Sequence, residues 1–267
     1  MASAQLKKIA RRLLGPRRLT QRALAREIAQ GEPEIRLIPS LADPQGTFID
    51  IGANQGVYAM CAQSHFARVV AVEAHPDLAN WLTRALGSKA EIRHTALSDS
   101  EGIAELHVPV MDDAEILTRC SLNSDANPGF GLRHVEVPMT SLDALAIDNV
   151  RVIKIDVEGH EFAVLRGARS TLSRWHPVCI VEVEERHNAG GTARAFSFFE
   201  ELGYKPWFVH RGALRPGGEF NPAQLQNPDN AIPGSGVRSP DYINNFIFVH
   251  ESDQTSLPRL RKALGRS

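Results

Sequence analysis

Blocks of apolar residues alternate with amphipathic stretches along most of this chain. Short apolar runs predict strands, and stretches with apolar residues at helical spacing predict helices. The predicted strands are residues 47–51, 68–73, 90–95, 103–109, 134–138, 151–157, 178–184, 204–210 and 244–250. The predicted helices are residues 55–66, 76–86, 160–174 and 192–202. Strands that alternate with helices indicate an α/β fold around a mostly parallel sheet with helices on both faces.

Two segments interrupt this pattern, residues 111–133 and residues 215–241, and both are rich in Gly, Pro and Asn. Long loops in a compact domain are often functional, and a loop near the carboxyl edge of the sheet could cover a substrate. Surface decoration is the other interpretation. We expect the specificity for an acceptor to lie in these two segments if they are functional.

Both ends of the chain are basic. Eight lysines and arginines precede the first acidic residue, Glu27, and apolar residues at helical spacing predict a short amphipathic helix that ends at Gly15-Pro16. Residues 1–45 are therefore expected to form a basic helical extension, and residues 251–267 a basic tail. The extension could contact a membrane surface or an acidic partner, serve as a targeting segment, or pack on the domain.

Length and composition predict one domain between these ends, over residues 46–250. The formal net charge of −1 provides no general attraction to nucleic acid, so no nucleic-acid partner is expected. The three cysteines lie outside any C-x-x-C motif, which argues against a disulfide framework and a zinc site. Because no apolar run approaches the roughly 18 residues of a membrane span, we expect a cytoplasmic protein.

The most distinctive segment is residues 48–56, which read FIDIGANQG. An apolar strand ends there in an acidic turn, and glycines in such a turn let backbone N–H groups approach a ligand. The turn precedes a predicted helix at the carboxyl end of a strand, where open α/β sheets bind ligands. Glu73 ends the next strand about 20 residues later, where a carboxylate can accept hydrogen bonds from ribose hydroxyls.

The glycine spacing distinguishes between cofactors. A dinucleotide site requires G-x-G-x-x-G, whereas Gly52 and Gly56 are four residues apart and Asn54 occupies the place of the second glycine. This argues against NAD. The pattern suits S-adenosylmethionine, which has no pyrophosphate and carries an amino-acid tail, although another nucleotide in an α/β site is the alternative interpretation.

A second acidic segment, residues 151–161, reads RVIKIDVEGHE. Strand alternation places Lys154, Asp156 and Glu158 on one face, and polar groups on a central strand must be paired or functional. Lys154 and Asp156 could form a structural ion pair, or Asp156 and Glu158 could face a methyl donor. His160 is a candidate general base because its ordinary pKa is near neutrality, although a histidine at a helix start is often only a surface residue.

Carboxylates of neighbouring strands could converge in the same cleft, because Glu182 ends the predicted strand over residues 178–184. Such a cluster could bind a metal ion. However, the sequence shows no histidines at ligand spacing near these carboxylates, so we expect no metal site.

These segments together resemble the FkbM-type methyltransferase family. The resemblance covers about residues 46–210, in the family's order, through residues 49–56, 71–76, 96–99, 140–143, 153–161 and 164–168. It implies a Rossmann-like class I methyltransferase fold and an S-adenosylmethionine-dependent methyltransferase. Family members known for O-methylation imply a hydroxyl acceptor on a sugar, a glycan or a polyketide-like small molecule.

The resemblance also implies roles for individual residues. Asp156 and the turn after it would lie nearest the transferable methyl group, and Asp156, Glu158 and His160 are the candidate catalytic bases. Glu73 would hold the ribose, with Ala74 beside it in the cofactor site. The remaining positions are Asp50, Gly52, Asn54 and Gly56 along the methionine moiety, and Leu97, Ser98 and Asp99 along the adenine.

Two other functions are alternatives to this one. Asn127-Pro128-Gly129-Phe130 faintly resembles the turn of nucleic-acid amino-methyltransferases, but it lacks the second proline and precedes the strand that leads to Asp156. The other alternative is a non-catalytic S-adenosylmethionine-binding module, tethered to a membrane or partner by the basic extension. The presence of Asp156, Glu158 and Glu182 argues for an enzyme instead.

Overall fold

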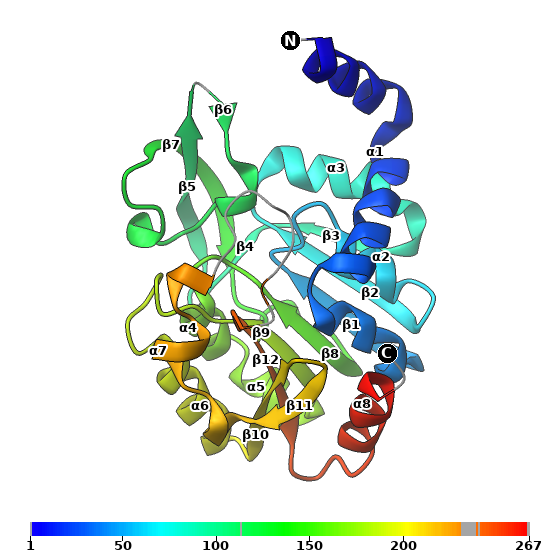
Figure 1. The fold of residues 1–267 in the computed structure, drawn as a ribbon, viewed down its shortest axis with the longest axis vertical. Coiled ribbons are helices and arrows are strands. Elements are labelled where there is room, and N and C mark those ends of the chain that lie inside the picture. The colour runs from blue at the N-terminus through cyan, green and yellow to red at the C-terminus, as the bar shows by residue number, and fades with distance from the viewer. Residues whose placement is uncertain (1, 113, 231–238, 240, 266–267) are drawn as a thin grey trace.

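The computed structural model describes residues 2–112, 114–230, 239 and 241–265. An eight-stranded sheet with helices on both faces forms the centre of the molecule (Figure 1). Its spatial order is β11-β10-β12-β9-β8-β1-β2-β3. The strands are β1 (Asp43–Ile51), β2 (Phe66–Glu73), β3 (Glu91–His94), β8 (Val150–Ile155), β9 (Val178–Glu182), β10 (Tyr204–His210), β11 (Ala213–Pro216) and β12 (Asn245–His250).

Five of these strands are parallel neighbours in the order β3-β2-β1-β8-β9, with β1 at the point where the chain reverses direction across the sheet. β12 runs antiparallel to both β9 and β10. The order of the parallel strands is that of a Rossmann-like sheet, so the predicted fold class is confirmed. Ligands bind such sheets outside the carboxyl ends of the strands on either side of the reversal, which are here β1 and β8.

The helices that cover the sheet are α2 (Val57–Ala62), α3 (Pro76–Leu86), α4 (Glu161–Arg166), α5 (Arg169–Trp175), α6 (Gly191–Glu201), α7 (Pro222–Leu225) and α8 (Ser256–Leu264). The predicted helix over residues 160–174 is thus two helices. Gly167 separates them because it packs on the backbone of Ser98: a Cβ atom on Gly167 would lie 1.9 Å from the Ser98 carbonyl oxygen. The Asp143 carboxylate then accepts hydrogen bonds from the N–H groups of Ser170 and Thr171, which begins α5.

Two predicted strands, 103–109 and 134–138, form an antiparallel hairpin outside the main sheet. They belong to a second sheet of order β4-β7-β5-β6, made of β4 (Ala96–Leu97), β5 (Gly102–Met111), β6 (Ala114–Glu115) and β7 (Gly131–Thr140). The hairpin buries Leu106, Val108 and Val137 on one face and exposes Glu105 on the other. Two short 3-10 turns, η3 (Leu117–Arg119) and η4 (Ser124–Ala126), lie in the connection between β6 and β7.

The basic N-terminal segment is helix α1 (Ala2–Gln30), which is kinked at Gly15 as the sequence predicts. The part after the kink packs on the domain: Thr20 is fully buried, donates a hydrogen bond to the Gln55 carbonyl oxygen at 2.9 Å, and accepts one from Trp81 Nε1. The side chains of residues 6–13, on which the predicted apolar stripe depends, lie outside the described ones. Of the three interpretations, packing on the domain is therefore observed for the second half of the segment.

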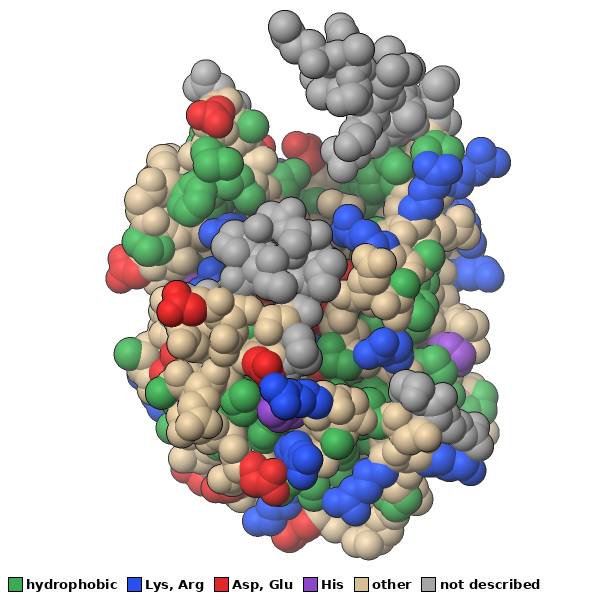
Figure 2. All heavy atoms as spheres, in the orientation of Figure 1, with side chains coloured by type: hydrophobic (Ala, Val, Ile, Leu, Met, Phe, Trp, Pro, Cys, Tyr) green, Lys and Arg blue, Asp and Glu red, His purple; other side chains and the backbone are tan. Residues whose placement is uncertain are grey.

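The chain continues from α1 through the 3-10 helix η1 (Pro33–Leu41), whose apolar side chains are buried beneath α8. The basic tail is anchored in the same layer because α8 buries Leu260 and Leu264. Exposed arginines of α1 and the tail face outward, where Figure 2 shows blue side chains beside both elements. Within the described part of the chain, no helix combines the length and the apolar character needed to cross a bilayer.

Candidate functional site

The carboxyl end of β1 leads into a tight turn with three residues at positive φ, Gly52, Asn54 and Gly56. Gly52 touches the end of β8, since a Cβ atom there would lie 1.8 Å from the Asp156 carbonyl oxygen. Gly56 instead faces α3, where a Cβ atom would lie 2.7 Å from Leu82 Cδ2. Gly56 therefore contributes to helix packing rather than to the lining of the pocket. It precedes α2, so the helix predicted over residues 55–66 begins at Val57.

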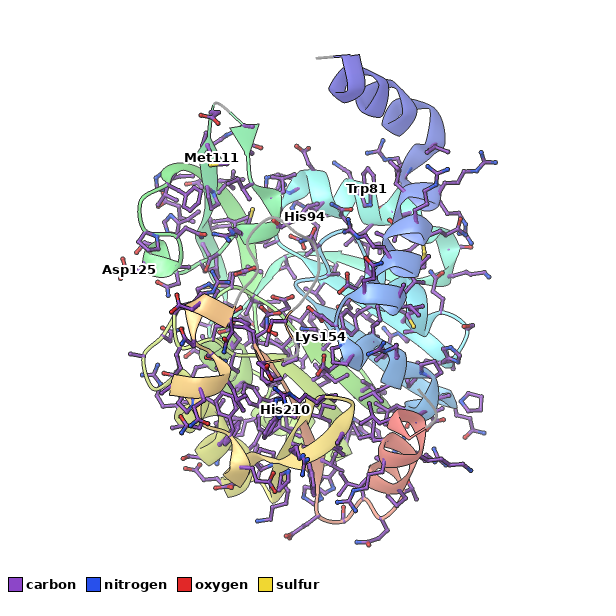
Figure 3. All side chains as sticks on the ribbon, in the orientation of Figure 1. Trp81, His94, Met111, Asp125, Lys154 and His210 are labelled. Atoms are coloured by element: carbon purple, nitrogen blue, oxygen red, sulfur yellow. The ribbon has the colours of Figure 1, made fainter. Side chains whose placement is uncertain are left out.

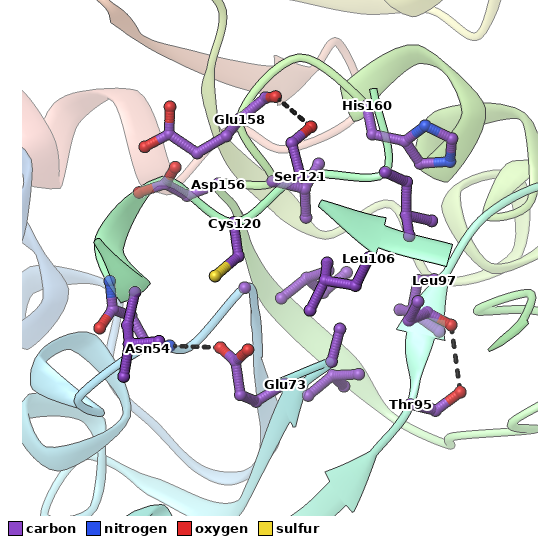
Figure 4. Close-up of a pocket in the computed structure, with 18 of the residues that line it drawn as sticks. Asn54, Glu73, Thr95, Leu97, Leu106, Cys120, Ser121, Asp156, Glu158 and His160 are labelled. Atoms are coloured by element: carbon purple, nitrogen blue, oxygen red, sulfur yellow. Dashed lines mark hydrogen bonds between the residues drawn. The ribbon is translucent and has the colours of Figure 1, made fainter. Parts of the chain in front are cut away.

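Glu73 joins this turn to the end of β2. Its carboxylate accepts a hydrogen bond of 2.8 Å from the Asn54 N–H group (Figure 4) and another of 2.8 Å from the His75 N–H group. The side chain is buried, and burial raises the pKa of Glu73 above its usual value. The turn after β1 therefore holds Glu73, the residue that the sequence predicted to bind the ribose, in place.

A pocket opens beside Glu73, between the strand ends and the β5–β7 hairpin. The predicted residues Gly52, Asn54, Glu73, Ala74 and Leu97 all line it. Its far wall was not predicted residue by residue: it consists of Thr95, Ala96, Leu106, Leu117, Thr118, Cys120, Ser121 and Leu122. Five of these lie in the irregular segment over residues 111–133, whose interruption of the strand pattern was the only sequence signal for them.

Cys120 lies in this wall with its sulfur directed into the pocket (Figure 4). Burial raises the pKa of its thiol to about 12. The neutral thiol is a small apolar lining group rather than a nucleophile.

Asp156 lies directly after β8 and lines the pocket near Asn54. Its Oδ2 atom is 3.7 Å from the buried Lys154 ammonium, so the predicted ion pair is present. Lys154, near the centre of the molecule in Figure 3, also donates a hydrogen bond of 3.1 Å to Asn245 Oδ1 on β12. Lys154 therefore contacts protein groups on two other segments, whereas Asp156 also borders the pocket.

Glu158 occupies the turn after Asp156 with a φ of 50°. Burial, together with the Asp156 charge, raises the pKa of Glu158 to about 8. Its Oε2 atom is 3.4 Å from His187 Nε2, and burial with the nearby Arg186 charge lowers the pKa of His187 to about 4. The fold therefore favours the protonated form of the Glu158 carboxyl group and the neutral form of His187.

His160 lies elsewhere in the pocket. Its Nε2 atom is 3.0 Å from Ser98 Oγ, and burial lowers the pKa of the ring. In Figure 4 its ring is on the Leu97 side, away from Asp156 and Glu158. The three predicted bases are thus divided between two ends of one pocket.

Ser98 and Asp99 lie behind the pocket rather than in its lining. Ser98 is buried against His160, and Asp99 accepts a hydrogen bond of 2.7 Å from Arg166 Nε at the surface. Only Leu97 of the predicted adenine border reaches the cavity. Ser98 therefore reaches the pocket only indirectly, by its hydrogen bond with His160.

Asp50 points to the other side of β1. Its buried carboxylate accepts a 2.8 Å hydrogen bond from the Ala59 N–H group of α2, and burial raises its pKa to about 7. It lines a second, larger cleft instead of the pocket beside Glu73. The cleft and the pocket adjoin each other, because both are lined by Gly52, Asn54, Thr118, Asp156 and Glu158.

The second cleft combines strand ends with the N-terminal segment. Asp50, Lys154 and Glu182 come from the sheet, and Tyr58 comes from α2. The opposite wall is formed by Ala23, Arg26, Glu27, Gly31 and Glu32. Packing of the extension on the domain was one of the expected alternatives, but no sequence signal pointed to these residues as a wall of the cleft.

The pocket beside Glu73 also fits a ligand with an amino group and a ribose. Asn54 Oδ1 is buried there with no hydrogen-bond partner among the described residues, and it can accept a hydrogen bond from an ammonium group. Glu73 provides carboxylate oxygens for hydroxyls, and Ala96, Leu97 and Leu106 provide apolar surface for a flat base. These features match the parts of S-adenosylmethionine.

Comparisons with known proteins show which family the sequence matches. A family model described as the methyltransferase FkbM domain matches residues 50–206. The hexuronic acid methyltransferase AglP of Haloferax volcanii is 29% identical over 164 residues, which are 59% of this chain and 64% of that protein. A methyltransferase FkbM structure from Methylobacillus flagellatus matches 78% of this chain and 44% of its own, with a TM-score of 0.48 and 14% identity. The chain thus spans less than two thirds of the length of both relatives.

Proposed function

Because the chain belongs to the FkbM methyltransferase family, we propose that it transfers a methyl group from S-adenosylmethionine to a hydroxyl group of a sugar or related small molecule. The observation that carries this proposal is the junction of two cavities at Asp156. One cavity suits the cofactor, and the other is large enough for an acceptor. The name of the relative AglP, a hexuronic acid methyltransferase, supports a sugar as the acceptor.

Glu73, Asn54 and Leu97 would hold the cofactor in the first pocket. S-adenosylmethionine, when bound, would supply the methyl group of its sulfonium to a nucleophile, with the neutral thioether S-adenosylhomocysteine as the leaving group. Glu73 would accept hydrogen bonds from ribose hydroxyls, and Asn54 Oδ1 would accept one from the amino group. Enclosure by Leu106 and the residues 117–122 would exclude water from the reacting atoms.

The second cleft would bind the acceptor. Its carboxylates are hydrogen-bond acceptors that suit the several hydroxyl groups of a sugar ring. Arg26 of α1 also lines this cleft, and it makes no ion pair with any described carboxylate. An acidic sugar would place its carboxylate near this guanidinium, which binds carboxylates in a bidentate manner.

Asp156 is the proposed general base. It lines both cavities, so an acceptor hydroxyl and the methyl donor would meet beside it. Its carboxylate would take the hydroxyl proton as the new bond forms. Glu158 is less suited to this role because burial and the Asp156 charge raise its pKa and favour its protonated form. His160 is less suited because its ring contacts Ser98 on the Leu97 side of the pocket.

Two measurements test the function. Calorimetric titration with S-adenosylmethionine should give a micromolar Kd. Transfer of a labelled methyl group should then be detected on a panel of hexuronic acid and neutral hexose glycosides. Binding without transfer to any hydroxyl compound would favour the non-catalytic module, and absence of binding would refute the methyltransferase proposal.

A further inference from the structure

We propose that the outer face of the β5–β7 hairpin binds a divalent metal ion of the zinc type through Glu105, His107 and His134. One ligand atom from each of these residues lies within 4.8 Å of the other two. The cluster lies on the hairpin face opposite Leu106, which lines the cofactor pocket. It is therefore a site separate from the one that carries the methyl transfer.

The strand register creates the cluster. Glu105 and His107 are two residues apart on β5 and so share a face, and His134 stands directly opposite His107 on β7. The two histidines are 27 residues apart along the chain. This separation is why the sequence suggested no histidines at ligand spacing and no metal site.

The distances between the donor atoms suit one small ion. His107 Nδ1 is 3.2 Å from His134 Nδ1, and Glu105 Oε1 is 2.9 Å from His134 Nδ1 and 3.9 Å from His107 Nδ1. Two nitrogens that each lie about 2.0–2.1 Å from a tetrahedral zinc ion stand roughly 3.4 Å apart. The three donors can therefore converge on one ion with shifts of a few tenths of an ångström.

The charge pattern of the same face independently favours a cation. Glu136 lies directly opposite Glu105, and both side chains are exposed. Like charges opposite each other on an antiparallel pair destabilise it. Among the described residues, no lysine or arginine forms an ion pair with either glutamate. A bound divalent cation would offset this repulsion between Glu105 and Glu136.

The metal would act on the wall of the cofactor pocket. The His107 backbone exchanges two hydrogen bonds, of 2.8 and 3.1 Å, with the Ser121 backbone. Ser121 Oγ in turn donates a 2.6 Å hydrogen bond to the Glu158 carbonyl oxygen. An ion that clamps β5 to β7 at His107 would therefore steady the segment that connects the hairpin to the turn at Glu158.

The test is titration of the tag-free, chelator-treated full chain with zinc chloride, followed by calorimetry and by thermal unfolding. The expected result is one equivalent bound with a raised Tm, and at least a tenfold weaker Kd in His107→Ala and in His134→Ala. Cys120→Ser and His65→Gln, which alter other candidate ligands, should bind as the wild type does. Cobalt(II) substitution should give the absorption bands of a tetrahedral site in the wild type. These bands should be absent in both histidine variants.

Amide hydrogen exchange provides a readout that does not depend on methyl transfer. Zinc should slow exchange in residues 102–111 and 131–140 of the wild type and leave His134→Ala unchanged. Absence of stoichiometric binding, or equal binding by the wild type and both histidine variants, would overturn the proposal. Neither result depends on whether the protein binds S-adenosylmethionine, so failure here is distinguishable from failure of the proposed function.

Discussion

Gly52 and Asp156 are in backbone contact across the ends of β1 and β8. A Cβ atom on Gly52 would lie 1.8 Å from the Asp156 carbonyl oxygen, and the φ of Gly52 is 74°. The contact joins the two motifs that stood out in the sequence, the glycine turn and the acidic segment. It also forms part of the boundary between the cofactor pocket and the second cleft, since both residues line both cavities.

Replacement of Gly52 by alanine should therefore separate the two strand ends. We expect Gly52→Ala to lower the free energy of unfolding by about 3 kcal/mol or more, because a steric clash adds to backbone strain of roughly 1–2 kcal/mol. Urea denaturation measures this loss. Gly190→Ala is the matched control, because Gly190 has a φ of 72° and a Cβ atom there would meet no atom within 4 Å. An equal loss in both variants would mean that the contact with Asp156 contributes nothing.

Glu73 and Asp156 should affect different steps of the reaction. Glu73→Gln keeps the shape of the side chain but removes the carboxylate, so we expect the Kd for S-adenosylmethionine to rise at least tenfold. Asp156→Asn should leave that Kd within about threefold and reduce kcat by roughly 100-fold or more, the usual contribution of a general base. Calorimetry and initial rates measure the two effects. Equal loss of cofactor affinity in both variants would contradict this division of roles.

Arg26 should select acidic acceptors. Arg26→Gln is expected to raise KM for a hexuronic acid glycoside about tenfold and to leave KM for the matching neutral hexoside unchanged, since only the former offers a carboxylate. The control is Arg22→Gln on the same helix, because Arg22 is exposed and does not line the cleft. A similar increase in KM for both acceptors would assign Arg26 a role in the shape of the cleft instead.

Glu158 should make stability depend on pH. Burial and the Asp156 charge raise its pKa from 4.5 to about 8, so the folded state holds this proton more tightly than the unfolded state does. The contribution to stability is therefore present at low pH and is lost as the pH rises from about 4.5 to 8. The other groups around Glu158 are Arg186, Glu184, Glu161 and His187.

Glu158→Gln removes this titration. Relative to the wild type, its free energy of unfolding should increase between pH 5 and pH 8.5 by at least about 1.4 kcal/mol, the equivalent of one pKa unit. Urea denaturation at each pH provides the measurement. Glu200→Gln, at an exposed position on α6, should show no such trend. A constant difference across this pH range would show that the Glu158 carboxyl group is not perturbed by folding.

Local sequence patterns were sufficient for much of the fold and part of the cofactor site. The apolar runs located the parallel strands, and the glycine turn with Glu73 identified neighbouring strand ends that the structure brings together. These features depend on backbone preferences and on spacings within one βαβ unit. The break inside the predicted helix over residues 160–174 was missed because it results from contact between Gly167 and Ser98, which are distant in the chain.

The sequence by itself determined the α/β class, the turn at Gly52 and the carboxylate that supports this turn, because short-range periodicity and glycine chemistry encode them. Only the tertiary structure decided which side chains share a cavity. Helix α1 packs on the turn after β1 through the hydrogen bond from Thr20 to Gln55, and so the N-terminal extension forms one wall of the second cleft. Likewise, strand register brings His107 to His134. Such contacts arise from burial and hydrogen bonding between distant segments, which no local pattern records.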